Sequence, residues 1–144
     1  MASSLTFTSS AFAYAAQFDS TETNNTEYDI LTVNATYDRR IYGISCTSTD
    51  TGAQTVKIFL HDGTTSFQIF TINIPLSSGN TTSAAAVDIF GSSLGASAFT
   101  KQRDANGVPY FNLPAGWKIR ASYGTVLGAG EVLNFLSFGE IYGA

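Results

Sequence analysis

The sequence predicts an all-β domain, an antiparallel, jelly-roll-like β-sandwich of seven or eight strands. Three observations predict it: short apolar runs with a period of two, turn signals between these runs, and no amphipathic helix of usable length. A chain of 144 residues fits one domain, which can bury roughly 70% of the surface of its unfolded form. We expect residues 1–144 to form a single domain, with residues 1–10 as a candidate N-terminal arm.

Alternation along the chain gives the expected strands. In the first of them Phe12, Tyr14, Ala16 and Phe18 share one side, which is the period of a half-buried strand. The polar segment 20–27 then reads as a loop. The full set of expected strands is residues 12–18, 28–33, 40–47, 56–60, 67–74, 108–113, 117–122 and 132–142.

Two segments in the middle of the chain carry more detailed expectations. In the strand 40–47, simple alternation places Tyr42, Ile44 and the only cysteine, Cys46, on one face, opposite Ile41, Gly43 and Ser45. Residues 84–94 fit either a short helix or an irregular strand, and two glycines argue against a long helix.

Two turns are predicted by their residue types. His61-Asp62-Gly63-Thr64 separates two strands, and its Asp-Gly pair supplies the positive φ that a tight hairpin requires. Pro114-Ala115-Gly116 is the second turn. In the strand after it Trp117, Ile119 and Ala121 alternate with Lys118, Arg120 and Ser122, so one face is expected to be buried and the other wet. If Trp117 is a buried anchor, its replacement by alanine is expected to cost roughly 3–5 kcal/mol of stability.

Composition excludes several classes of partner. Only 12% of the residues are charged and the net charge is −4, so seven Lys and Arg residues form no basic stripe for nucleic acid. No apolar run reaches the roughly 20 residues of a membrane span, and the N-terminus has no pattern of an export signal. Removing water from a surface of Ser, Thr, Asn and Gly costs less free energy than removing it from a highly charged surface, which favours a protein that packs against other proteins.

No catalytic, cofactor-binding or metal-binding residues are predicted. His61 and Asp62 are adjacent, but neighbours in a tight turn point apart and no nucleophile elbow accompanies them. The acidic residues Asp19, Glu22, Glu27 and Asp29 match no calcium-loop spacing and read as solvated charges. We therefore expect a binding protein and not an enzyme.

Two segments resemble a known family: Ile58-Phe-Leu-His-Asp-Gly63 and Leu113-Pro-Ala-Gly-Trp-Lys-Ile-Arg-Ala-Ser122. Their order and spacing are similar to those of small structural proteins of tailed bacteriophages and prophages. The resemblance extends from about Arg40 to Ser122. It implies structural roles for Asp62 and Gly63 in the hairpin, and for Pro114, Gly116 and Trp117 as turn and core anchor.

The same resemblance implies a function. It points to a capsid decoration (cement) protein that binds the major capsid protein on the outside of the virion, often as a homotrimer, and is made in the bacterial cytoplasm. The alternative is a carbohydrate-binding or receptor-binding module of a phage fibre or tail, because β-sandwiches serve that role equally well. A sugar binder needs aromatic rings on a solvent face, whereas alternation places most aromatic residues of this chain inward.

The N-terminal segment is the expected interface. Residues 1–10 carry no charged side chain and offer Leu5 and Phe7 as alternating apolar groups. Such a segment can add as a strand to the exposed edge of a neighbouring sheet. The equally open alternative is that it forms the first strand of its own sandwich.

Overall fold

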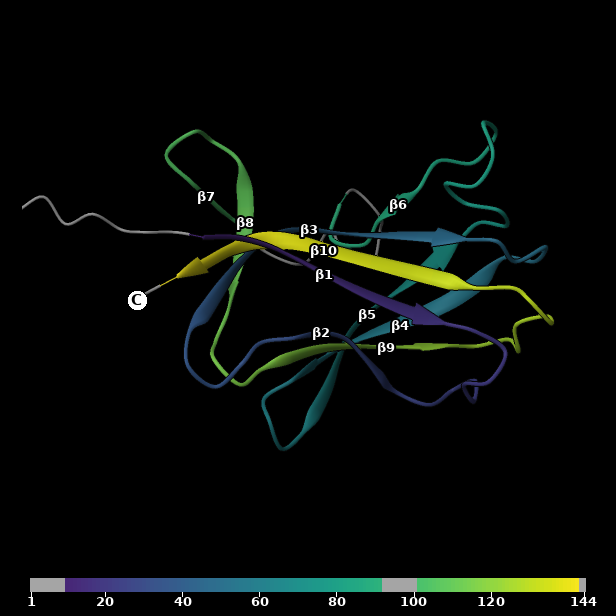
Figure 1. Ribbon diagram of the computed structural model, residues 1–144, viewed down its shortest axis with the longest axis horizontal. Helices are drawn as coiled ribbons and strands as arrows, with labels where there is room; N and C mark the ends of the chain where they lie inside the picture. Colours follow the sequence, from purple (N-terminus) through teal and green to yellow (C-terminus); the bar gives the residue numbers. More distant parts are fainter. Residues whose placement is uncertain (1–9, 92–100, 143–144) are drawn as a thin grey trace, which may run out of the picture.

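The computed structural model describes residues 10–91 and 101–142, and in that part every regular element is a strand (Figure 1). The ten strands are β1 (Ser10–Phe18), β2 (Tyr28–Thr32), β3 (Asp38–Ser48), β4 (Gln54–His61), β5 (Ser66–Ile74), β6 (Val87–Asp88), β7 (Gln102–Arg103), β8 (Pro109–Leu113), β9 (Lys118–Tyr123) and β10 (Leu133–Tyr142). The all-β prediction is confirmed. The two strands beyond the expected seven or eight, β6 and β7, have two residues each, which is too short to show a period.

The strands form two antiparallel sheets packed as a sandwich (Figure 1). The larger sheet has the order β1-β10-β3-β8-β7, with β6 paired to β3, and the smaller sheet has the order β2-β9-β4-β5. Without the two-residue strands, the eight remaining strands follow the jelly-roll order, in which the first strand pairs with the last and the second with the last but one. The jelly-roll-like sandwich is therefore confirmed.

The core lies between the sheets and is rich in aromatic rings. At one end the ring of Phe18 packs against Phe135 at 5.1 Å and Tyr123 at 5.9 Å. At the other end Phe90 packs against Phe111 at 4.5 Å and edge-on against Phe70 at 5.3 Å. These contacts join strands of both sheets, so the aromatic residues hold the two layers together.

A β-bulge in β3 makes the predicted faces of that strand wrong. The pairing of β3 with β10 shifts between Phe138 and Gly139, which face Gly43 and Ile41, so Tyr42 is the extra residue. Ile41 is consequently buried together with Ile44 and Cys46, while Tyr42 is only half-buried. Simple alternation had placed Ile41 and Tyr42 the other way round. The difference arises because a bulge reverses the faces of the side chains that precede it.

Burial raises the pKa of the Cys46 thiol to about 12.

The segment left open by the sequence is irregular. It contains β6, which pairs with Ser45 and Cys46 of β3, and then Ile89 and Phe90, which are buried in the core. No helix is found in the described residues 84–91.

The larger sheet is completed by the two ends of the described chain. β1 pairs along its whole length with β10, from Ser10 opposite Ile141 to Phe18 opposite Leu133. Of the candidate arm, Ser10 is the first residue of β1, whereas residues 1–9, including Leu5 and Phe7, lie outside the described residues, so the arm remains a prediction there. Within the described part of the chain no helix is long and apolar enough to cross a membrane.

Candidate contact surface

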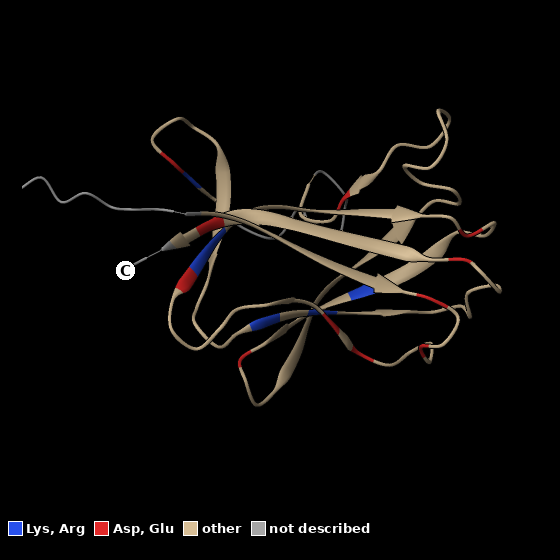
Figure 2. Ribbon diagram, in the orientation of Figure 1, with Lys and Arg blue, Asp and Glu red and all other residues tan. Residues whose placement is uncertain are grey.

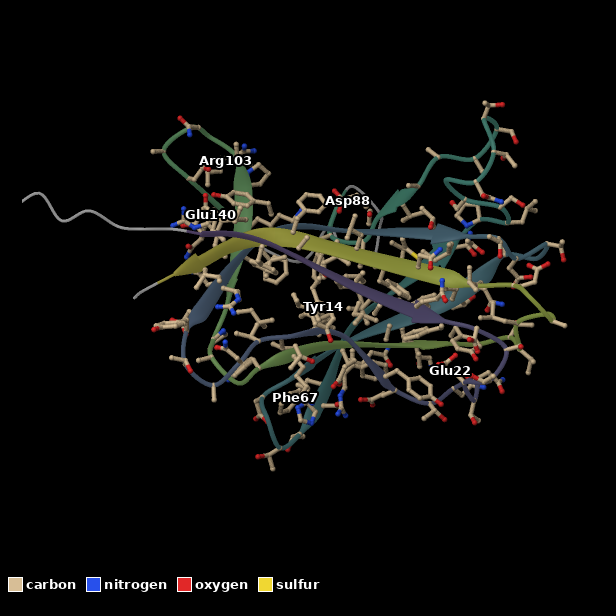
Figure 3. The ribbon with its side chains drawn as sticks, viewed as in Figure 1. Tyr14, Glu22, Phe67, Asp88, Arg103 and Glu140 are labelled. Atoms are coloured by element: carbon tan, nitrogen blue, oxygen red, sulfur yellow. The ribbon has the colours of Figure 1, made fainter. Side chains whose placement is uncertain are left out.

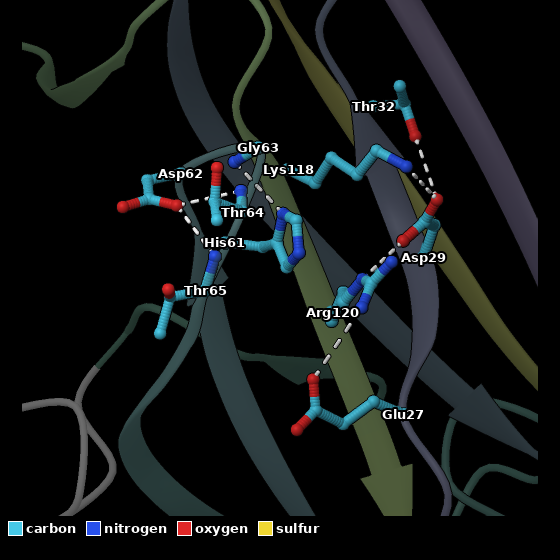
Figure 4. A network of polar contacts seen from close by, with 10 residues as sticks. All are labelled: Glu27, Asp29, Thr32, His61, Asp62, Gly63, Thr64, Thr65, Lys118 and Arg120. Atoms are coloured by element: carbon cyan, nitrogen blue, oxygen red, sulfur yellow. Dashed lines mark hydrogen bonds and ion pairs between the residues drawn. The ribbon is translucent and has the colours of Figure 1, made fainter.

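The hairpin between β4 and β5 is closed by its own polar groups (Figure 4). The backbone N–H groups of Thr64 and Thr65 donate to Asp62 Oδ1 at 2.9 and 2.8 Å, and that of Gly63 donates to His61 Nδ1 at 3.0 Å. These backbone hydrogen bonds lower the pKa of Asp62, and Gly63 has a φ of 98°. The Asp62 carboxylate and the His61 ring are thus engaged with the turn backbone, which is the arrangement of a structural turn.

The second turn lies against the first. Trp117 N–H donates to the Pro114 carbonyl at 3.1 Å, and Gly116 between them has a φ of 79°. A methyl group on Gly63 would lie 3.8 Å from the Gly116 carbonyl oxygen, and His61 pairs with Lys118. The two segments that carry the family resemblance therefore form one corner of the molecule.

Trp117 is less buried than the sequence indicated. It precedes β9, packs against the core and is half-buried, whereas Ile119 and Ala121 of the same strand are fully buried. Lys118 and Arg120 lie on the outer face of the smaller sheet with polar partners, as expected. The prediction is wrong for Ser122, which was placed on the same wet face and is 4% exposed.

That outer face carries a charged network (Figure 4). Asp29 of β2 receives hydrogen bonds from Lys118 Nζ at 2.8 Å and Arg120 Nε at 2.6 Å, and Glu27 lies 3.9 Å from Arg120. Burial raises the pKa of Asp29, but the hydrogen bonds and charges of both cations outweigh it and bring the pKa below its ordinary value of 3.8. Since Asp29 belongs to β2 and both cations belong to β9, the network ties these two strands together.

The low pKa of Asp29 predicts a pH dependence of stability. A carboxyl whose pKa is lower in the folded chain stabilises the fold above its ordinary pKa, and this contribution is lost as the pH falls through the folded-state value. Asp29→Asn is therefore expected to lose less stability than the wild type when acidified below about pH 4. Urea unfolding between neutral and acidic pH measures this, and equal losses in the two proteins would contradict it.

The remaining acidic residues of the first loop, Asp19 and Glu22, accept hydrogen bonds from within the loop. Asp19 Oδ1 accepts hydrogen bonds from Thr21 N at 2.7 Å and Thr21 Oγ1 at 2.6 Å, and Glu22 accepts one from Asp19 N at 2.6 Å. Residues 10–91 and 101–142 contain no group of three or more His, Cys, Asp or Glu that could hold a metal ion.

The outer face of the larger sheet is apolar over its first two strands. Ala13 and Ala15 of β1 stand directly opposite Phe138 and Leu136 of β10, and all four side chains are exposed. Leu136 is 45% exposed and Phe138 is 44% exposed. Together with Ala11, these four residues form a surface that we name the alanine face.

Ala11 stands opposite Glu140, and next to Leu136 and Phe138 the alanine face continues toward β3 without a charge. Leu136 stands opposite Ser45, and Phe138 stands opposite Gly43, where a methyl group would lie 3.3 Å from the Phe138 ring. Figure 2 shows Lys, Arg, Asp and Glu at the end of the sheet where β3 begins and in the loops, while the middle of β1 and β10 has none. Glu140, labelled in Figure 3, is at that charged end and lies 3.8 Å from Arg40.

Sequence reasoning did not single out Leu136 and Phe138. The closing strand is apolar on both faces, with Leu133 and Phe135 buried and the other two exposed. A strand that is apolar on both faces is typical of burial on both sides. Here one of those sides is the molecular surface. The apolar residues on both faces of this strand were the feature of the sequence that could have indicated an exposed apolar surface.

Comparison with solved structures finds chains of similar fold, one of which is described here. No protein-family model matches the chain, and no curated protein matches it. A solved structure described as the acidic stable capsid structure of Helicobacter pylori bacteriophage KHP30 contains a chain similar to this one, with a TM-score of 0.46 and 12% sequence identity. The alignment covers 93% of this chain and 89% of that chain.

Proposed function

We propose that this protein is a non-enzymatic structural component of a bacteriophage virion. Its role is that of a capsid decoration (cement) protein, which binds the major capsid protein on the outside of the head as a homotrimer. The observation that carries the proposal is the alanine face, a sheet surface of five uncharged residues, two of which are large, apolar and exposed.

The energetics of the alanine face suit a stable protein contact. Burial of a whole Leu or Phe side chain is worth about 1.5–3 kcal/mol, and Leu136 and Phe138 each leave nearly half of the side chain to be buried. The alanines between them add area without losing side-chain rotamer freedom. No charged group in the face has to lose its hydration, so the contact has a low desolvation cost.

The setting on a phage rests on the sequence resemblance. Its two motifs, around His61-Asp62-Gly63 and Pro114 to Trp117, lie against each other in one corner, so the likeness concerns a connected part of the fold. Jelly rolls occur in viral capsid proteins and also in lectins, and the fold alone does not choose between these roles.

A carbohydrate-binding or receptor-binding module of a phage fibre or tail is the second candidate. One observation favours it: Phe67 of β5, which projects near the hairpin tip in Figure 3, is 52% exposed. An exposed ring beside polar groups can stack on a sugar. The alanine face has no role in this alternative, and a glycan array with the purified protein tests it.

The salt dependence of capsid binding tests the proposed function. Purified protein is mixed with capsids that lack it, and the capsids are pelleted at about 0.1 and 1 M salt, where the screening length falls from about 10 to 3 Å. We expect the protein to pellet at both salt concentrations, because apolar burial is not screened. Release at high salt would contradict an apolar contact, and failure to pellet at either concentration would contradict the proposed function.

A further inference from the structure

Each sheet of a sandwich has two edges, and the four edges here are protected unequally. An open edge presents unpaired N–H and C=O groups, and natural proteins block such edges with short strands, charges, prolines or bulges. β7 is two residues long and includes Arg103. β2 is five residues long, carries Asp29 and has a bulge between Asp29 and Leu31. β5 is interrupted by a bulge at Ile69, which has no counterpart on β4, and is followed by Pro75.

β1 has none of these protections. It is nine residues long, its sequence SAFAYAAQF contains no charge and no proline, and its pairing with β10 is unbroken from end to end. Among the described residues β10 is the only strand that pairs with β1. Its free edge is therefore a long, regular and uncharged template for another strand.

The core beneath this edge is incompletely covered. Phe12, Tyr14 and Ala16 of β1 point toward the core, as Figure 3 shows for Tyr14, but each is only half-buried. Phe18, at the end of the same strand, is 2% exposed. One more strand beside β1, with apolar side chains on its inner face, would cover the three half-buried residues.

We propose that residues 1–9 of a second copy of this chain occupy the free edge of β1. The segment is MASSLTFTS, which has no charged side chain and equals β1 in length. It places Leu5 and Phe7 two residues apart, the spacing of Phe12 and Tyr14, so both can point inward beside those rings. Fully extended, nine residues reach roughly 30 Å, well beyond the spacing of about 5 Å between neighbouring strands.

The segment of the same copy is less suited to this place than that of a neighbour. It leads directly into Ser10, so it would have to reverse its direction to lie beside its own β1. The two-residue turns of tight hairpins favour Gly, Asn or Asp at positive φ, and residues 1–9 contain none of these and no proline. The donor is therefore a neighbouring copy, and donation from each copy to the next closes a ring, as in the proposed homotrimer.

The oligomeric state in the absence of capsids tests the inference. Light scattering at tens of micromolar is expected to give the mass of a trimer for the wild type and that of a monomer for Leu5→Asp/Phe7→Asp. Thr6→Asp/Thr8→Asp is the matched control, because it adds the same charge on the other face of the segment and is expected to remain a trimer. A monomeric wild type, a trimeric Leu5→Asp/Phe7→Asp variant or a monomeric control would overturn the inference.

A mixing experiment separates the donor segment from the acceptor edge. One variant lacks residues 2–8 and keeps the edge, and the other carries Tyr14→Lys, which puts a charge on the inner side of the edge and blocks it. Each alone is expected to be a folded monomer, and their mixture a one-to-one heterodimer. Ala16→Lys replaces Tyr14→Lys if thermal unfolding shows that the latter does not fold. A mixture that stays monomeric would overturn the inference.

These experiments distinguish the inference from the proposed function, on whose self-association it rests. A trimer that does not pellet with capsids contradicts the decoration role and leaves the edge pairing standing. A monomer that pellets with capsids contradicts the edge pairing and leaves the decoration role standing.

Discussion

Replacement of Phe90 by alanine is expected to destabilise the protein by about 3–5 kcal/mol, the usual cost of removing a large buried aromatic side chain. Phe90 is 1% exposed, and its ring lies between Phe70 of the smaller sheet and Phe111 of the larger one. Its removal leaves a cavity between the layers that neither sheet can close without moving. Urea unfolding followed by far-ultraviolet circular dichroism measures the loss.

Two further variants calibrate this result. Trp117→Ala is now expected to cost about 1–3 kcal/mol, less than for a fully buried indole, because Trp117 is half-buried. His61→Ala removes one hydrogen bond at an exposed hairpin and is expected to cost about 1 kcal/mol or less. A Phe90→Ala variant no less stable than His61→Ala would contradict the packing described here.

The second large effect is expected at the alanine face. Leu136→Asp/Phe138→Asp replaces both exposed apolar side chains by charges that would be buried in the contact. We expect capsid binding to weaken about 100-fold or more, since the lost burial of two half-exposed side chains alone is worth about 2–3 kcal/mol. Quantitative pelleting with capsids measures this.

The matched control for this variant is Thr71→Asp/Asn73→Asp. These residues are exposed on β5 of the smaller sheet and receive the same change of charge. The control is expected to bind like the wild type, and both double variants are expected to stay folded because they alter exposed positions. Equal binding by the two double variants would remove the alanine face from the contact.

Much of the fold could be predicted from local patterns. The period of two in β1, where Phe12, Tyr14, Ala16 and Phe18 point inward, depends only on the backbone of a strand with one buried face. The hairpin at Asp62 and Gly63 depends on the φ preference of its own residues. Such features are decided within a few residues, so the sequence contains the necessary information.

Other features depend on partners that are distant in the sequence. The bulge at Tyr42 exists because β3 pairs with β10, some ninety residues later, and it reverses the faces of Ile41 and Tyr42. Phe90 belongs to no long strand and is buried only because both sheets converge on it. The alternation of apolar residues along a short segment predicts neither the bulge at Tyr42 nor the burial of Phe90.

The candidate surface shows the same limit. Leu136 and Phe138 lie in a strand that was correctly predicted, yet both of its faces are apolar. Which face is covered depends on the position of the second sheet, and that follows from the jelly-roll order and not from the strand itself. Sequence reasoning favoured Leu5 and Phe7 as the interface, and the structure adds the alanine face as a second surface.

Imaging of the virion tests the central claim, that this protein decorates the outside of a capsid, most directly. A reconstruction of particles that carry the chain is expected to show threefold sandwich density on the outer surface of the shell, with β1 and β10 turned toward the major capsid protein. The same density is expected to be missing from particles made without the chain. Density for the chain only on a fibre or tail, or none on the head, would contradict the claim.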